Sequence, residues 1–213
     1  MASLPLLVLG TSSFPVEVAE VASDAGFQVV GFVENERRER CTDLLEGLPI
    51  HWVDDLRELA SNHVVVCGLG TTFRTRFTEQ ASAMGAAFAT VVHPSAHVPA
   101  SVVLGEGCVV GVGVIVGAHT KVGRHVAINR GALIGHHASI GDHATISPGA
   151  NVGGNTAIGE ATYVSMGAIV INGLHVGAHA VIAAGAVVID DLADRVLAVG
   201  VPAKVVKDGI AGK

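Results

Sequence analysis

Apolar residues recur every six positions from about Val98 to Val188. When the chain is written in blocks of six from Val103, the second residue of every block is aliphatic, the residue two places before it is small or apolar, and the residue after it is usually glycine. Two inward side chains separated by an outward one indicate a short strand, and a small residue next to them suits a sharp corner. Each block is therefore predicted to be a strand followed by a turn. The aliphatic positions are Leu104, Val110, Val116, Val122, Ile128, Ile134, Ile140, Ile146, Val152, Ile158, Val164, Val170, Val176, Ile182 and Val188.

Three blocks close one triangular coil of about 18 residues, and successive coils stack through backbone hydrogen bonds along a common axis. The six-residue period is unbroken between Val98 and Val188, so we expect about five coils without an inserted loop. The predicted domain is a parallel β-helix over residues 93–213, with a closing segment at its C-terminal end.

Residues 4 to 92 have a different pattern, in which short apolar runs alternate with helical stretches. This alternation predicts a Rossmann-like α/β domain with a small parallel sheet over residues 1–92. The apolar start of the chain has no basic residues and no clear cleavage site, so we interpret it as the first strand. The expected strands are 4–10, 27–33, 63–70 and 87–92, and the expected helices are 14–25, 54–60 and 71–84.

Polar residues follow the first two predicted strands. The turn after the first strand precedes a helix, whose first amide N–H groups are able to hold a phosphate. The residues after the second strand are where ribose hydroxyls are often bound. The turn sequence GTSS is not G-x-G-x-x-G, so nucleotide binding and a purely structural turn both remain open. The candidate substrate-binding residues are Gly10, Thr11, Ser12, Ser13, Glu34 and Asn35.

Charge and cysteine content exclude several classes of protein. The formal net charge is -6, and no basic cluster is longer than Arg37-Arg38, which argues against a nucleic-acid or anionic-membrane surface. No apolar stretch is long enough to span a membrane. Cys41, Cys67 and Cys108 are scattered and odd in number, which favours reduced thiols in a cytoplasmic protein over a disulfide framework or a zinc site.

The repeat and the two-domain organisation, joined through residues 93–96 and closed by Gly200-Val201-Pro202-Ala203-Lys204, resemble the hexapeptide-repeat sugar acetyltransferases. The similarity is to the sialic acid O-acetyltransferases and the bacillosamine-type nucleotide-sugar N-acetyltransferases, and it covers almost the whole chain. It implies a left-handed β-helix and a homotrimer that binds acetyl-CoA between subunits, with no metal. It also implies a nucleotide-linked sugar on the first domain. The expected acceptor is the amino group of such a sugar, and the alternative is a hydroxyl of a sialic acid or related sugar.

Acetyl transfer from a thioester needs a base for the acceptor's proton and a donor for the oxyanion. Histidine suits the first role. Five histidines of the repeat share one position, three residues after an inward aliphatic, and are interpreted mostly as a solvated rim: His119, His125, His137, His143 and His179. His136 is the only histidine in its own position, and the resemblance identifies it as the general base.

The resemblance implies further site residues. His137 stands where some relatives have an acidic residue that supports the base, which leaves open whether Asp142 or a carboxylate of an adjacent subunit orients His136. The amide of Gly154 would face the thioester carbonyl. The remaining cofactor-binding residues are Met166, Ala183 and Ala184 along the pantetheine, and Pro202 and Lys204 at the adenine and phosphate end. Phe14 stands near a histidine of the N-acetylating relatives, so a different acceptor or a weaker nucleotide site remains open.

Two other functions fit a β-helix of this kind. The γ-class carbonic anhydrases hold a metal between histidines of two subunits, but here Ala184 occupies the place of the third ligand. A non-catalytic β-helix that only scaffolds or binds nucleotide is the second possibility. It predicts no protection by acetyl-CoA and no effect of changing His136.

Overall fold

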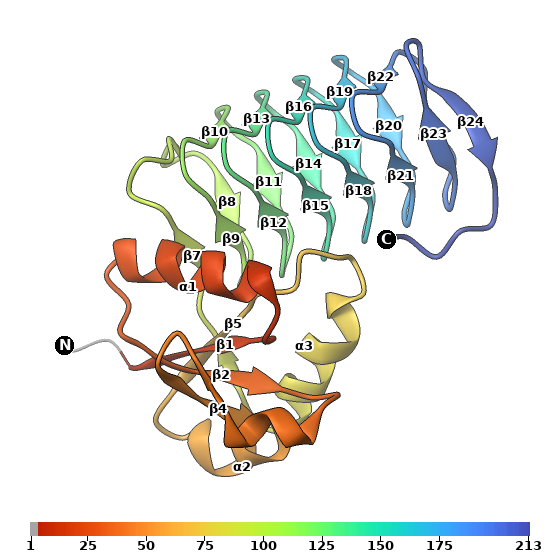
Figure 1. The fold of residues 1–213 in the computed structure, drawn as a ribbon. Helices are drawn as coiled ribbons and strands as arrows, with labels where there is room; N and C mark the ends of the chain where they lie inside the picture. The colour runs from red at the N-terminus through yellow and green to blue at the C-terminus, as the bar shows by residue number, and fades with distance from the viewer. Residues whose placement is uncertain (1–3) are drawn as a thin grey trace.

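The computed structural model describes residues 4–213, so the first three residues of the predicted first domain lie outside the described part (Figure 1). Its N-terminal part is an α/β region in which one sheet has the strand order β3-β4-β2-β1-β5-β6. All neighbouring strands are parallel except β3 and β4. The elements are β1 (Leu6–Leu9), α1 (Ser13–Asp24), β2 (Val29–Glu34), η1 (Arg38–Thr42), β3 (Leu44–Leu45), β4 (Leu48–Trp52), η2 (Val53–Asp55), α2 (Leu56–Leu59), β5 (Val64–Cys67), α3 (Arg74–Ala83) and β6 (Ala87–Phe88).

The predicted strands and helices are present, with two differences. The hairpin of β3 and β4 was not predicted, because β3 has only two residues and β4 has a proline and a histidine within its apolar residues. The last predicted strand, 87–92, divides into two. Its first half, β6, pairs with β5, while β7 (Val91–Val92) pairs with β9 and so belongs to the next part of the fold.

In the second part, the strands from β8 to β22 have two residues each and recur every six residues without interruption, as the sequence predicted, and two longer strands, β23 and β24, follow them. They form three parallel faces and fit a left-handed β-helix. The strands are β8 (Val103–Leu104), β9 (Val109–Val110), β10 (Ile115–Val116), β11 (Lys121–Val122), β12 (Ala127–Ile128), β13 (Leu133–Ile134), β14 (Ser139–Ile140), β15 (Thr145–Ile146), β16 (Asn151–Val152), β17 (Ala157–Ile158), β18 (Tyr163–Val164), β19 (Ile169–Val170), β20 (His175–Val176), β21 (Val181–Ile182), β22 (Val187–Val188), β23 (Leu197–Val199) and β24 (Lys204–Lys207).

The core of the β-helix is built from the predicted inward positions. The aliphatic ladder is buried from Val110 to Val188, and the small residues two positions before it are buried from Cys108 to Ala186 except Leu174. Glycine follows the ladder because a side chain would meet the next coil: a Cβ on Gly141 would lie 2.5 Å from the backbone nitrogen of Glu160. The repeat is therefore fixed by the lack of space at each corner.

The three corners of the coil are distinct, and we number them by the faces that they join. The first corner joins the β10-β13-β16-β19-β22 face to the β8-β11-β14-β17-β20 face, the second leads on to the face that contains β9 and β12, and the third returns to the β10 face. The first corner comprises 117–120, 135–138, 153–156 and 171–174; the second 105–108, 123–126, 141–144, 159–162 and 177–180; and the third 111–114, 129–132, 147–150, 165–168 and 183–186.

The N-terminal part packs on the β9-β12-β15-β18-β21 face, with α1 and α3 nearest to the β-helix (Figure 1). Arg74 of α3 joins the two parts. It is 1% exposed, and its guanidinium donates to the carbonyl of His143 at 2.6 Å and to the hydroxyl of Thr145. Burial lowers the pKa of this guanidinium. Its other acceptors are the carbonyls of Leu69, His125 and Ala144.

The rim interpretation of the histidines is wrong for His125 and His143, each of which is 7% exposed. Their rings stack on each other with centroids 5.0 Å apart, beneath Phe88 and Thr78 of the N-terminal part. Burial lowers the pKa of both to about 4, so both are neutral at pH 7. The sequence did not reveal this because their position in the repeat is the same as that of exposed histidines. Only the docking of α3 and β6 distinguishes them.

Candidate active site

His136 lies at the first corner, between β13 and β14, and its side chain is exposed. The next coil along the chain stacks directly on this corner, since the N–H of Asn155 donates to the His136 carbonyl at 2.8 Å. The imidazole lies over Gly154 of that coil: a Cβ on Gly154 would be 3.1 Å from both Cε1 and Nε2 of His136. The glycine at 154 therefore leaves the space that the ring occupies.

Gly154 also offers a hydrogen-bond donor next to the imidazole. Its backbone N–H donates to no group in the part of the chain that the structure describes. An imidazole and an amide N–H thus lie close together on consecutive coils, and acyl transfer needs a base and an oxyanion donor of these kinds.

His137 contacts His136 directly, with the two Nδ1 atoms 3.1 Å apart. Asp142, the alternative partner from the sequence, does not reach this corner in one subunit. It lies at the second corner, where it accepts hydrogen bonds from the backbone and guanidinium of Arg124. Burial would raise the pKa of Asp142, but the bonds from Arg124 outweigh it, and the pKa lies below its usual value. Within one protomer the structure therefore favours His137 over Asp142 as the neighbour of the base.

The expected pantetheine residues lie elsewhere in the protomer. Met166, which is 60% exposed, and Ala184 occupy the third corner, and the N–H of Gly185 donates to the Met166 carbonyl. Ala183 precedes Ala184 at the same corner, and Pro202 and Lys204 lie exposed at the closed end beside β22. One full face of the β-helix, the β10 face, separates these residues from His136. A single subunit therefore does not bring the two sets together.

The turn after β1 and the residues after β2 lie next to each other at the carboxyl edge of the sheet. Gly10 has a φ of +107°, and the buried Thr11 hydroxyl donates to the Glu34 carboxylate, which also accepts from the backbone of Asn35. Burial would raise the pKa of Glu34, but these hydrogen bonds and those from the backbone of Glu36 and Arg37 outweigh it and lower the pKa. Glu34 thus ties together the two turns, with its oxygens already engaged by the chain.

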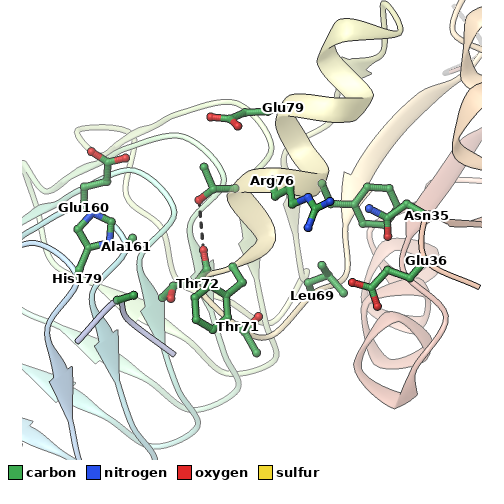
Figure 2. A pocket seen from close by; sticks show the side chains of 14 residues that line it. Asn35, Glu36, Leu69, Thr71, Thr72, Arg76, Glu79, Glu160, Ala161 and His179 are labelled. Carbon is green, nitrogen blue, oxygen red and sulfur yellow. Dashed lines mark hydrogen bonds between the residues drawn. The ribbon is translucent and has the colours of Figure 1, made fainter. Parts of the chain in front are cut away.

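Two pockets open at this edge. The larger has a volume of about 730 Å³ and lies between the N-terminal part and the second corner of the β-helix (Figure 2). Asn35, Leu69 and Thr71 line it from the N-terminal part, and Glu160 and His179 line it from the β-helix, as Figure 2 shows. The strand order reverses between β1 and β5, and ligands of open parallel sheets bind at such a point.

The second pocket, of about 450 Å³, lies between the start of α1 and the third corner. Ser12, Ser13 and Gly70 line one side, and Arg130 and Met166 line the other. Thr71 lines both pockets, so they meet at the loop after β5.

Sequence reasoning missed Thr71 and Arg130 as lining residues. Thr71 follows β5 at the same edge of the sheet as the turns after β1 and β2. The polar residues of those two turns are the binding candidates predicted from the sequence, and the same reasoning applied to β5 would have identified Thr71. No feature of the sequence indicates Arg130. It lines the second pocket because the third corner packs against α1. There its guanidinium pairs with Glu17 at 2.6 Å.

No group of three or more histidine, cysteine or acidic side chains among residues 4–213 is arranged to hold a metal ion. None of the helices described is long and apolar enough to cross a membrane.

No protein-family model matches the chain, and no curated protein sequence matches it. Solved structures do match. A variant of GDP-perosamine N-acetyltransferase from Caulobacter crescentus, in complex with CoA and GDP-perosamine, is 31% identical, covers 97% of this chain and 100% of that chain, and has a TM-score of 0.89. The acetyltransferase domain of PglB from Neisseria gonorrhoeae, in complex with acetyl coenzyme A, is 28% identical over 95% of this chain and 98% of that chain, with a TM-score of 0.85. WeeI from Acinetobacter baumannii, at 19% identity and a TM-score of 0.73, shares the fold.

The β-helix of stacked hexapeptide coils and the similarity to acetyltransferases with CoA or acetyl-CoA bound define the class of acyltransferases that use acetyl-CoA as the acyl donor. The similarity at 31% identity extends over nearly the whole chain, including the α/β region. The chain belongs to the hexapeptide-repeat sugar N-acetyltransferase family.

Proposed function

We propose that this enzyme transfers the acetyl group of acetyl-CoA to the amino group of a nucleotide-linked amino sugar, with His136 as the general base. The observation that carries the proposal is the similarity, over 97% of the chain, to an enzyme that has CoA and GDP-perosamine bound. The sugar hydroxyl that the sequence left as an alternative serves as the comparison acceptor in the test below.

The acceptor would occupy the two pockets at the carboxyl edge of the sheet. The larger pocket has Asn35 at the end of β2, where a ribose is commonly held. The second pocket has the start of α1 beside Ser12 and Ser13, and a helix N-terminus favours a phosphate. Since the pockets meet at Thr71, a nucleoside diphosphate sugar lying across that loop would direct its sugar toward the third corner.

His136 would act through Nε2, the ring nitrogen beside Gly154. It accepts a proton from the amine as the amine nitrogen attacks the thioester carbonyl, and the Gly154 amide donates to the oxyanion that forms. When the carbon–sulfur bond breaks, the proton passes from His136 to the leaving thiolate, and the histidine is neutral again. The products are the N-acetylated sugar and CoA thiol.

A homotrimer would assemble this site from two subunits. One face of the β-helix is covered by the N-terminal part, and another presents polar Lys121 and His175. The β10 face instead exposes an outward ladder that is apolar at Ile115, Leu133 and Ile169, which are 49%, 40% and 40% exposed, and polar at Asn151. Packing these faces around a threefold axis would remove the ladder from water and place the first corner of one subunit beside the third corner of the next. The base and the expected pantetheine residues would then meet.

We expect Leu133→Glu to dissociate the trimer, because it places a carboxylate next to Ile115 on the proposed interface. The measurement is the molar mass by light scattering, together with acetyl transfer, which should fall with the mass. The matched control is His175→Glu, which introduces the same carboxylate at an outward exposed position of the polar face and should leave the mass unchanged. A Leu133→Glu protein with the wild-type mass would contradict the interface.

The acceptor is tested by a screen that reads free thiol released from acetyl-CoA. Nucleotide-linked amino sugars with different bases are compared with the corresponding nucleotide sugars that carry a hydroxyl in place of the amine, and with free sialic acid. The proposal expects release only with the amino forms. Release with the hydroxyl forms or sialic acid alone would establish the O-acetyltransferase alternative.

The proposal also covers the type of the first domain, the number of coils in the β-helix and the location of the protein. The parallel order of β4, β2, β1, β5 and β6 supports a Rossmann-like domain over residues 1–92, and five strands on each of two faces support about five coils over residues 93–213. The three free cysteines support a cytoplasmic location.

A further inference from the structure

The contact between His136 and His137 restricts which ring nitrogen of each histidine carries the hydrogen. Their Nδ1 atoms are 3.1 Å apart, and the rings are nearly perpendicular, with an interplanar angle of 85°. A neutral imidazole has one nitrogen that donates and one that accepts, so a bond between two Nδ1 atoms requires a hydrogen on one and a lone pair on the other. The pair therefore has two possible states, which differ in the nitrogen of His136 that carries the hydrogen.

Only one of these states leaves His136 able to act as a base at Nε2. If His137 donated, the Nδ1 of His136 would be the acceptor, its hydrogen would lie on Nε2, and Nε2 could not take a proton. If His136 donates from Nδ1, its Nε2 lone pair is free beside Gly154. On the proposed function, we infer that His137 is a positioning residue whose Nδ1 accepts the Nδ1–H of His136 and so fixes the tautomer of the base.

The backbone and the neighbouring coil hold His137 in place for this role. It has a left-handed φ of +56°, and its N–H donates to the Ala118 carbonyl at 2.9 Å. Its ring also lies against the ring of His119, with centroids 5.0 Å apart. The titratable side chains in contact with His137 are therefore His119 on one side and His136 on the other, and both contacts are with imidazoles.

A neutral partner has a consequence that a carboxylate partner would not have. A carboxylate stabilises a positively charged imidazole, whereas a neutral imidazole accepts one hydrogen bond and adds no charge. Protonating His137 would place two N–H groups face to face and break the bond.

The repeat itself supplies substitutions that fit the backbone of residue 137. Asn155 and Gly173 occupy the same corner position in the next two coils, with φ of +55° and +76°. His137→Asn keeps an acceptor oxygen, and His137→Gly removes the acceptor without strain. His137→Asp supplies a carboxylate. His175→Asn is the control, because it changes an exposed histidine of β20 whose side chain contacts neither His136 nor His137 among the described residues.

We expect His137→Gly to lower kcat about 10- to 100-fold, as the loss of an orienting partner does elsewhere, with the KM for acetyl-CoA within about twofold of wild type. His137→Asn should recover most of kcat. His137→Asp should move the acidic limb of the pH profile to higher pH, because the carboxylate favours the protonated form of His136. Wild-type kcat and pH profile in His137→Gly, or an equal loss in His175→Asn, would overturn the inference.

A second measurement is independent of the acceptor. Nitrogen NMR of the histidine rings at neutral pH should show His136 with its hydrogen on Nδ1 in the wild-type protein and with a changed tautomer ratio in His137→Gly. A wild-type His136 with its hydrogen on Nε2 would overturn the inference. Failure of the proposed function would instead appear as a wild-type enzyme that has the expected tautomer and releases no thiol with any amino sugar.

Discussion

Replacing His136 with alanine is expected to lower kcat/KM for acetyl transfer by about 10²- to 10⁴-fold, the usual contribution of a general base. The loss should be mainly in kcat, because the histidine exchanges a proton only as the amine attacks. Since the side chain is exposed at a corner and alanine occurs at the stacked position 118, the fold should tolerate the change. Thiol release with a saturating amino-sugar acceptor is the measurement.

The control for this substitution is His175→Ala. His175 is an exposed outward residue of β20 on the same β-helix, and its side chain has no contact with His136 among the described residues. Its activity and melting temperature should match the wild type. Near-normal turnover of the His136→Ala enzyme, with its fold intact, would remove His136 from the mechanism and leave the fold assignment unaffected.

Replacing Arg74 with methionine is expected to destabilise the protein by about 3 kcal/mol. Methionine fills a similar volume, but it leaves the Thr145 hydroxyl and the His143 carbonyl without their buried donor. For a chain of this length, that loss corresponds to a fall in melting temperature of about 10 °C. Because the arginine lies between the two parts of the fold, the N-terminal part should also be cleaved faster in limited proteolysis.

Arg76→Met is the matched control for Arg74→Met. Arg76 lies on the same helix but is exposed, so its loss should change the melting temperature by less than about 2 °C. Equal melting temperatures for the two variants would show that the buried bonds of Arg74 contribute little. In that case the apolar contacts of α1 and α3 would hold the N-terminal part in place.

On the proposed function, each subunit alone holds an incomplete catalytic unit. His136 and Gly154 lie at the first corner, whereas the pocket proposed for the acceptor opens toward the third corner of the same chain. If the trimer forms as proposed, assembly and activity are coupled, and an enzyme diluted below its dissociation constant would lose activity without unfolding.

Several parts of the fold followed directly from local pattern. The strands of the β-helix were predictable because an inward aliphatic and a small or apolar inward residue return every six positions, usually followed by a glycine where the next coil leaves no space for a side chain. The alternating elements of the N-terminal part were predictable for a similar reason, since each strand shows an apolar run. The hairpin of β3 and β4 was not, because β3 has only two residues and β4 has a proline and a histidine within its apolar residues.

The sequence by itself determined the repeat, the register of every coil and the distinct position of His136, because these depend on side-chain size within a few residues. Only the tertiary structure decided which histidines are buried, since His125 and His143 have the same local pattern as His119 and differ only in what packs above them. The tertiary structure also placed Asp142 away from His136, because side chains six residues apart lie at different corners of a triangular coil. It placed the His137 ring in contact with the His136 ring. Contacts between elements far apart in sequence have no local signature, and the final form of the site depends on them.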